Sequence, residues 1–128
     1  MKNSISIIAL VIIGGYFFIQ SSPRDQAGQK PGSIYTAGVK KVIDEKCYGC
    51  HSAAGKSRDA KNALMWDSLP GLPKGKLVAT LDDIIKVVGK NKMPPAGVIK
   101  EYPEMRLLPS EKQILQSWAE SRADSLLK

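Results

Sequence analysis

The chain has 128 residues, 43% of them hydrophobic, and a formal net charge of +7. This length suits one small domain with an appendage, and the hydrophobic fraction excludes a wholly disordered chain. From residue 33 onward there are 16 Lys and Arg against 11 Asp and Glu, so the domain itself is basic, with a net charge of +5.

An apolar segment opens the chain. Lys2 precedes an uncharged run over residues 3–23, whose apolar centre spans residues 5–19. As a helix this centre would rise about 22 Å, short of a hydrocarbon core of about 30 Å, although the full uncharged run would span it. No A-x-A-type cleavage site follows, so we favour an uncleaved membrane anchor over residues 1–22, with a cleaved signal peptide as the alternative. The charge of Lys2 favours a cytoplasmic N-terminus, which places the domain on the periplasmic side of the membrane, anchored or soluble.

Residues 23–33 are predicted to form a flexible linker, because they are rich in Ser, Pro, Gly and Gln and lack apolar periodicity. The domain then covers residues 34–128. Its first helix is predicted over residues 35–46, which with the next residue present one apolar face made of Tyr35, Val39, Val42, Ile43 and Cys47.

This helix leads into the sequence CYGCH at residues 47–51. The pattern C-x-x-C-H is typical of covalent haem c attachment, in which two thiols bind the vinyl groups and the imidazole ligates the iron. Cys47 and Cys50 are the only cysteines, and His51 is the only histidine. A disulfide or a thiol–disulfide redox site is the competing interpretation in an exported protein. A redox site of that kind would be accompanied by a β-α-β pattern, which the sequence lacks.

Beyond the motif, residues 52–73 are predicted to form a loop with one short helical turn at most. A second helix is predicted from an N-cap at Thr80 to Gly89, with an apolar face made of Leu81, Ile84, Ile85 and Val88. Two successive prolines then place Met93 on an extended segment. Residues 96–109 are expected to form an irregular connection.

The last helix is predicted to begin at a capping box formed by Ser110 and Gln113 and to pack on the first helix. No strand pattern of useful length is present. The sequence therefore predicts an all-α domain of three main helices with long loops around one covalent haem.

A second axial ligand for the iron must come from elsewhere in the chain. Met93 lies 42 residues beyond His51, far enough to wrap a haem, and the two prolines after it stiffen its segment. Met65, Met105, a lysine or an open site are the alternatives. For the second ring nitrogen of His51, we expect a backbone carbonyl acceptor within residues 69–73. Three aromatic side chains are candidates either for haem contact or for plain core packing: Trp66, Trp118 and Tyr102.

Together these residues resemble the small bacterial haem-binding domain family of monohaem cytochromes c. The resemblance covers roughly residues 36–121 and rests on CYGCHS at 47–52, ALMWDSL at 63–69, the sequence MPP at 93–95 followed by Pro103, and LPSEKQILQSW at 108–118. It implies a class I cytochrome c-like fold, one haem c, and axial ligation by His51 and Met93.

The favoured function is a membrane-tethered cytochrome c that carries single electrons between extracytoplasmic redox partners and is not an enzyme. The basic residues Lys86, Lys90, Lys92 and Lys100 bracket Met93, which suits an acidic partner surface, with an ordinary solvated surface as the alternative. A haem-based ligand sensor or peroxidase-like protein, with an open or displaceable sixth site, is the second candidate function. The sequence offers it no distal His or paired Arg. Nucleic acid is a poor partner, because the domain is exported and its aromatic residues are not interleaved with basic ones.

Overall fold

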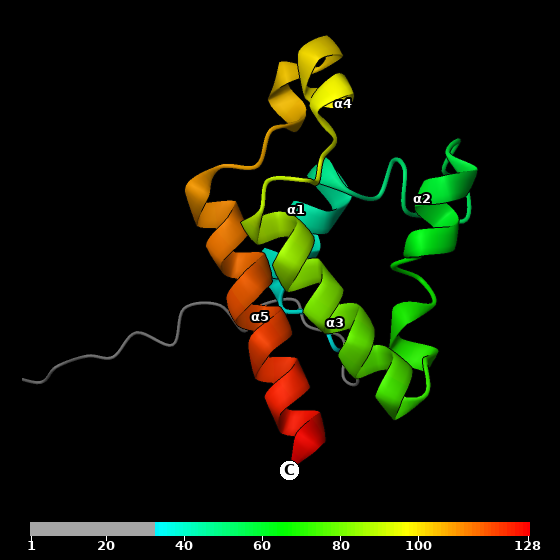
Figure 1. Cartoon of the computed structure of the whole chain (residues 1–128), viewed down its shortest axis with the longest axis vertical. Helices are drawn as coiled ribbons and strands as arrows, with labels where there is room; N and C mark the ends of the chain where they lie inside the picture. Colours follow the sequence, from blue (N-terminus) through cyan, green and yellow to red (C-terminus); the bar gives the residue numbers. More distant parts are fainter. Residues whose placement is uncertain (1–32) are drawn as a thin grey trace, which may run out of the picture.

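The computed structural model describes residues 33–128. Within them the chain forms five α-helices and two short 3-10 helices and contains no strand (Figure 1). The all-α prediction is therefore confirmed for this part of the chain. The predicted membrane anchor and nearly all of the predicted linker lie outside the described residues. Between residues 33 and 128, no helix is both long enough and apolar enough to cross a membrane.

Helix α1 spans Ala37–Lys46, close to its predicted bounds. Thr36 caps it, because its hydroxyl accepts a hydrogen bond from the backbone N–H of Val39 at 3.3 Å. Val39, Val42 and Ile43 on the predicted apolar face are buried. The amphipathic pattern therefore places this helix correctly, and its last turn delivers the chain into the C-x-x-C-H sequence.

Helix α3 spans Lys74–Gly89, so its predicted end is right and its predicted start is wrong. Pro73 is the N-cap, and Thr80 lies inside the helix, where its hydroxyl donates to the carbonyl of Lys76 at 2.8 Å. The helix closes with Asn91 in the left-handed conformation, at a φ of 54°. The N–H groups of Asn91 and Lys92 bond back to Val88 and Val87, the pattern of a Schellman motif.

Helix α5 spans Pro109–Leu127, and its predicted capping box is also wrong. Pro109 takes the first helical position, which suits its fixed φ, and Leu108 is the N-cap. The carboxylate of Glu111 accepts the backbone N–H of Leu108 at 2.7 Å, so Glu111 has the role predicted for Gln113.

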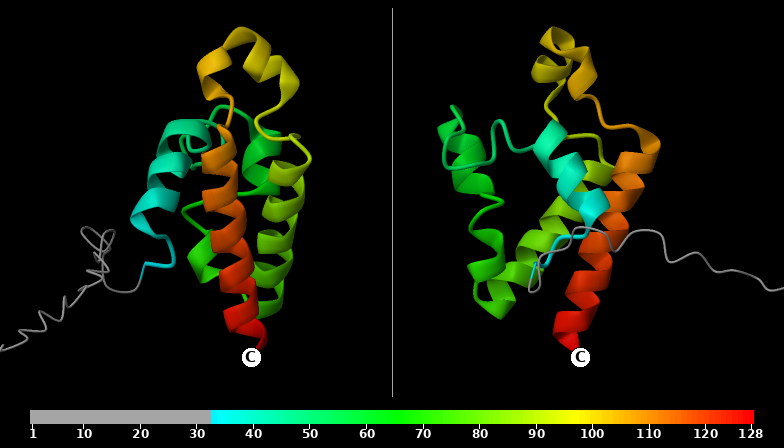
Figure 2. Two further views of the ribbon diagram at one scale, coloured as in Figure 1. Left: turned by 90° about the vertical axis from the view of Figure 1, so that its left-hand side faces the viewer. Right: turned by 180° about the vertical axis from the view of Figure 1, so that it is seen from behind.

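Helices α3 and α5 pack side by side in opposite directions, and α1 lies against α5 as predicted (Figures 1 and 2). The core between them contains the fully buried side chains of Leu81, Leu115 and Val39. Tyr35, Trp66 and Trp118 extend this core as a ring cluster, with centroids 5.5–6.2 Å apart. Two hydrogen bonds fix the cluster: the Tyr35 hydroxyl donates to the carbonyl of Trp66 at 2.6 Å, and the Trp118 indole donates to the carbonyl of Ile34 at 2.8 Å.

Both segments predicted as irregular contain short helices. Helix α2 spans Arg58–Ala63 and is followed by the 3-10 helix η1 at Leu69–Gly71. Helix α4 spans Ala96–Glu101 and is followed by η2 at Pro103–Met105. Helices α4 and η2 lie beyond the end of the α3–α5 pair, while α2 stands on the opposite side of α3 from α5 (Figures 1 and 2). Neither α2 nor α4 buries a residue completely, which is why apolar periodicity gave no sign of them.

Candidate functional site

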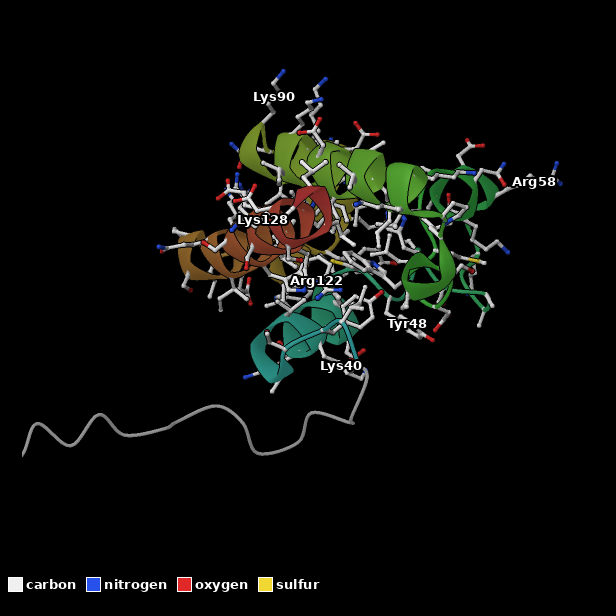
Figure 3. All side chains as sticks on the ribbon, turned by 90° about the horizontal axis from the view of Figure 1, so that it is seen from below. Lys40, Tyr48, Arg58, Lys90, Arg122 and Lys128 are labelled. Atoms are coloured by element: carbon white, nitrogen blue, oxygen red, sulfur yellow. The ribbon has the colours of Figure 1, made fainter. Side chains whose placement is uncertain are left out.

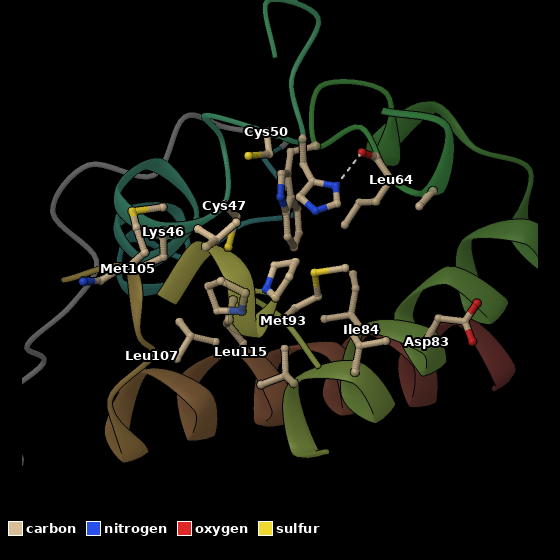
Figure 4. Close-up of a pocket in the computed structure, with 18 of the residues that line it drawn as sticks. Lys46, Cys47, Cys50, Leu64, Asp83, Ile84, Met93, Met105, Leu107 and Leu115 are labelled. Carbon is tan, nitrogen blue, oxygen red and sulfur yellow. Dashed lines mark hydrogen bonds between the residues drawn. The ribbon is translucent and has the colours of Figure 1, made fainter. Parts of the chain in front are cut away.

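All four predicted site residues line a single cavity of about 270 Å³. Cys47, Cys50 and His51 lie on one side, and Met93 approaches from the segment between α3 and α4 (Figure 4). Apolar side chains make up most of the remaining wall: Ala63, Leu64, Trp66, Ile84, Val87, Val88, Pro94, Pro95, Val98, Met105, Leu107 and Leu115. Residues far apart in the sequence are thus gathered around one apolar space.

The turn formed by the C-x-x-C-H motif, residues 47–51, is called the attachment turn. It starts where α1 ends. Cys47 is the C-cap of α1, and its carbonyl accepts hydrogen bonds from the N–H groups of Cys50 and His51 at 3.2 and 3.0 Å. A few residues on, Gly55 comes so close that a Cβ placed on it would lie 2.3 Å from the carbonyl oxygen of Cys50. Only glycine fits there without a shift of the backbone, so the loop after His51 supports the turn.

The two cysteine thiols are free and differ in exposure, with Cys47 half-buried and Cys50 exposed. Burial, followed by the negative charges of Glu111 and Cys50, raises the pKa of Cys47 to about 12. A thiol–disulfide redox site needs an attacking thiol with a lowered pKa. The environment of Cys47 does the opposite, which disfavours that interpretation of the motif.

The His51 imidazole is oriented by α2. Its Nδ1 lies 2.9 Å from the carbonyl oxygen of Ala60 and 3.0 Å from that of Leu64, the second contact being the dashed line in Figure 4. Both partners can only accept hydrogen bonds, so Nδ1 must carry the proton and Nε2 keeps its lone pair. The sequence-based choice of residues 69–73 as the acceptor is wrong. The acceptors are instead the carbonyl of Ala60 in α2, which also accepts the N–H of Leu64 at 2.9 Å, and the carbonyl of Leu64, the C-cap of that helix.

Met93 lines the cavity and is half-buried (Figure 4), and Pro94, which also lines it, is buried. The peptide bond between the two residues is cis. Met105 also reaches the cavity, from the end of η2, although its charged sequence neighbours gave no signal of this. Met65 does not line the cavity and is half-buried elsewhere. The cavity therefore brings together one imidazole and two thioethers.

Of the three aromatic candidates, Trp66 alone lines the cavity. Its indole Nε1 is buried and has no hydrogen-bond partner. Trp118 is buried in the ring cluster and has used its N–H on Ile34, and Tyr102 is 51% exposed, away from the cavity. Lys46 also lines the cavity, and its ammonium group donates to the backbone carbonyl of Glu104.

The lysines predicted to surround Met93 are all exposed. Lys86 pairs with Asp82 at 2.6 Å, an exposed contact one helical turn apart that contributes little to stability. Lys90 extends away from the end of α3 (Figure 3). These side chains leave positive charge beside the Met93 segment and outside the apolar cavity.

Chemically, the largely apolar cavity wall carries the imidazole of His51, two thiols, two thioethers, the ammonium group of Lys46 and the carboxylate of Asp83. No group of three or more His, Cys, Asp or Glu side chains able to hold a metal ion occurs between residues 33 and 128. Comparison of the chain with protein-family models, with curated proteins and with solved structures found no match.

Proposed function

We propose that the chain is a monohaem c-type cytochrome with a class I cytochrome c-like fold, transferring single electrons between exported redox partners. The observation that carries this proposal is the shared cavity, in which the only histidine and Met93 meet both cysteines of the C-x-x-C-H motif. In this proposal residues 1–22 anchor the domain to the periplasmic side of the cytoplasmic membrane, or are cleaved to release it.

The cavity residues fit a haem. Cys47 and Cys50 would hold it by thioethers, while His51 Nε2 and the Met93 sulfur would ligate its iron. When bound, haem c supplies a one-electron couple. The Nδ1–H of His51 is held by two carbonyl oxygens, which keeps the ring oriented and strengthens its ligating nitrogen. Trp66 Nε1 needs an acceptor, and a haem carboxylate would provide one.

The same residues favour an electron carrier over a sensor or peroxidase-like protein. No second histidine exists, and no arginine lines the cavity in the described part of the chain. The thioether of Met93, which lines the cavity, would serve as the second protein ligand of the iron. Because a neutral thioether favours the ferrous iron, this ligand set also suits a carrier of raised reduction potential.

Haem staining of a denaturing gel tests the attachment. The chain, expressed with a c-type maturation system, should stain, and a Cys47→Ala/Cys50→Ala variant exported to the same level should not. An unstained wild-type chain would overturn the proposal.

Ferric absorption spectra then test the sixth ligand. Met93→Ala should lose the sulfur-to-iron band, and Met65→Ala, whose thioether lies outside the cavity, should keep it. Met105 is a second thioether in the cavity, so Met105→Ala and the Met93→Ala/Met105→Ala pair show whether it replaces Met93. A Met93→Ala spectrum identical to wild type, with the band also kept in the double variant, would remove both thioethers from the iron and return the ligand-binding function to first place.

A further inference from the structure

A second pocket lies directly behind the Met93 segment. Its volume is about 450 Å³, within the range of small-molecule sites. Met93, Pro94 and Leu107 line both this pocket and the first cavity, so they form the wall between the two. Ala96 and Ile99 of α4 add apolar surface.

The polar lining of this pocket is cationic. Lys100, Arg106 and Lys112 reach it from α4, from the residue after η2 and from α5, and Asn91 adds an amide. No Asp or Glu is among the described residues that line it. Three positive charges therefore converge on one concave surface from three separate elements.

These charges have no carboxylate partner. The two ion pairs between described side chains join Lys40 to Asp44 and Lys86 to Asp82, outside the pocket. Lys112 donates to the side-chain carbonyl of Asn91, a neutral acceptor. Glu111, next to Lys112 in the sequence, accepts the N–H of Leu108 at the start of α5, and Glu101 and Glu104 do not line the pocket.

We propose that this pocket binds a small organic or inorganic anion carrying two or more negative charges on carboxylate or phosphate groups. The cations would take the oxyanions by charge-assisted hydrogen bonds, and the apolar wall would contact the ligand's carbon skeleton where it has one. A concave pocket of this volume with clustered positive charge suits a compact polyanion. An extended acidic protein surface would instead suit lysines arranged on a flat face.

The shared wall gives the bound anion a route to the first cavity. This step rests on the proposed cytochrome function. Negative charge behind Met93 favours the oxidised iron, so binding of the anion lowers the midpoint potential. The ferric form should accordingly bind the anion more tightly than the ferrous form, by the same free energy.

Isothermal titration of the haem-loaded chain with citrate and, separately, with inorganic pyrophosphate tests the pocket. Saturable binding of one anion per chain is expected for at least one of them, and the tighter ligand identifies carboxylate or phosphate as the preferred chemistry. Arg106→Gln and Lys100→Gln should each weaken binding about five- to tenfold, because each loses one charge-assisted contact. Both residues are exposed, and neither side chain forms a hydrogen bond or ion pair with another residue between positions 33 and 128, so these variants should fold.

Lys74→Gln is the matched control, since it removes the same charge from the first turn of α3, at the opposite end of that helix. It should bind as wild type does. Binding of neither anion, or equal weakening by Lys74→Gln, would overturn the proposal, the latter by showing attraction to net charge alone.

The two proposals fail separately. An unstained chain would refute haem attachment. The titration could still be interpreted, because the three cations of the pocket do not depend on a bound haem. A stained chain with its sulfur band intact and no anion binding would refute the pocket alone.

Discussion

The two walls of the cavity are built differently. The His51 wall is held by backbone groups: His51 bonds to two carbonyls, the N–H of Trp66 bonds to the carbonyl of His51 at 3.1 Å, and Gly55 packs on the carbonyl of Cys50. The Met93 wall is a proline-bounded segment with a second pocket of about 450 Å³ behind it. Hydrogen bonds and close packing hold the His51 wall in place, whereas the pocket behind the Met93 wall leaves space into which its side chains can shift.

This difference matches two requirements that the protein would have to meet in order to hold a covalently bound redox cofactor. A ligand next to the attachment points must stay aligned with them, which favours a fixed imidazole. In the proposed cytochrome, Met93 would tune the reduction potential and limit the access of other ligands to the iron, and a small displacement of its side chain would change both without unfolding the domain. We therefore expect substitutions on the His51 wall to lower the stability of the domain and those on the Met93 wall to change the properties of the bound iron.

The largest effect is expected at Gly55. In Gly55→Ala the new methyl group collides with the carbonyl of Cys50 at 2.3 Å, so the attachment turn must shift. Overpacking of this kind costs about 1–3 kcal/mol of unfolding free energy, and the yield of haem-stained protein should fall with it. Gly71→Ala is the control, since its Cβ would meet nothing within 4 Å. Equal stability of the two variants in urea unfolding would show that the His51 wall is not tightly packed.

A smaller effect is expected from the tryptophans of the ring cluster. Trp118→Phe removes the N–H bonded to Ile34 and leaves that carbonyl unpaired, for a loss of about 1–2 kcal/mol. The midpoint potential should stay unchanged, because Trp118 does not line the cavity. Trp66→Phe makes the same change in size at the cavity wall and should shift the potential. A shift in Trp118→Phe, or none in Trp66→Phe, would contradict these assignments.

Alkaline pH should lower the stability of the domain through the buried phenol of Tyr35. Burial, and then the charge of Asp67, raise the pKa of Tyr35 above its usual value. The folded state thus keeps the phenol proton at a pH where the unfolded chain has begun to lose it. Stability is unaffected below about pH 10, the unfolded pKa, and falls above it by at most about 1.4 kcal/mol per pH unit.

Urea unfolding of wild type and Tyr35→Phe between pH 8 and about pH 11 measures this dependence. Tyr35→Phe should lose this part of the slope, and Tyr102→Phe, at an exposed position outside the cluster, should retain it. The same slope in wild type and Tyr35→Phe would mean that the phenol proton is not held by the fold.

How far the sequence predicts the molecule depends on burial. Helices α1, α3 and α5 bury apolar faces, so periodicity located them, although the start of α3 was missed because its first turn is Lys-Gly-Lys. No side chain of helix α2 is fully buried, so apolar periodicity could not locate this helix or identify it as the source of a partner for His51. The one local signal was Ser57, whose hydroxyl accepts the N–H of Ala60 at 3.2 Å as an N-cap.

The residues of the candidate site also differ in how far the sequence could predict them. Cys47, Cys50 and His51 form a single short motif, and the prolines set Met93 apart, so sequence alone named four of the residues that line the cavity. Met105 and the cationic pocket depend on how α4 and η2 fold over the end of α5. The pocket brings together residues as far apart as Asn91 and Lys112 without a repeating pattern, which only the tertiary structure reveals.

The smallest effect on stability is expected at Met93 itself. Met93→Leu nearly conserves volume, and the pocket behind the wall can absorb the change in shape, so the loss of unfolding free energy should stay below about 1 kcal/mol. The ferric spectrum should nevertheless lose its sulfur-to-iron band. Met65→Leu, half-buried outside the cavity, is the matched control and should keep the band at a similar stability. A loss above about 2 kcal/mol in Met93→Leu would mean that the Met93 wall is packed as firmly as the His51 wall, removing the contrast between them.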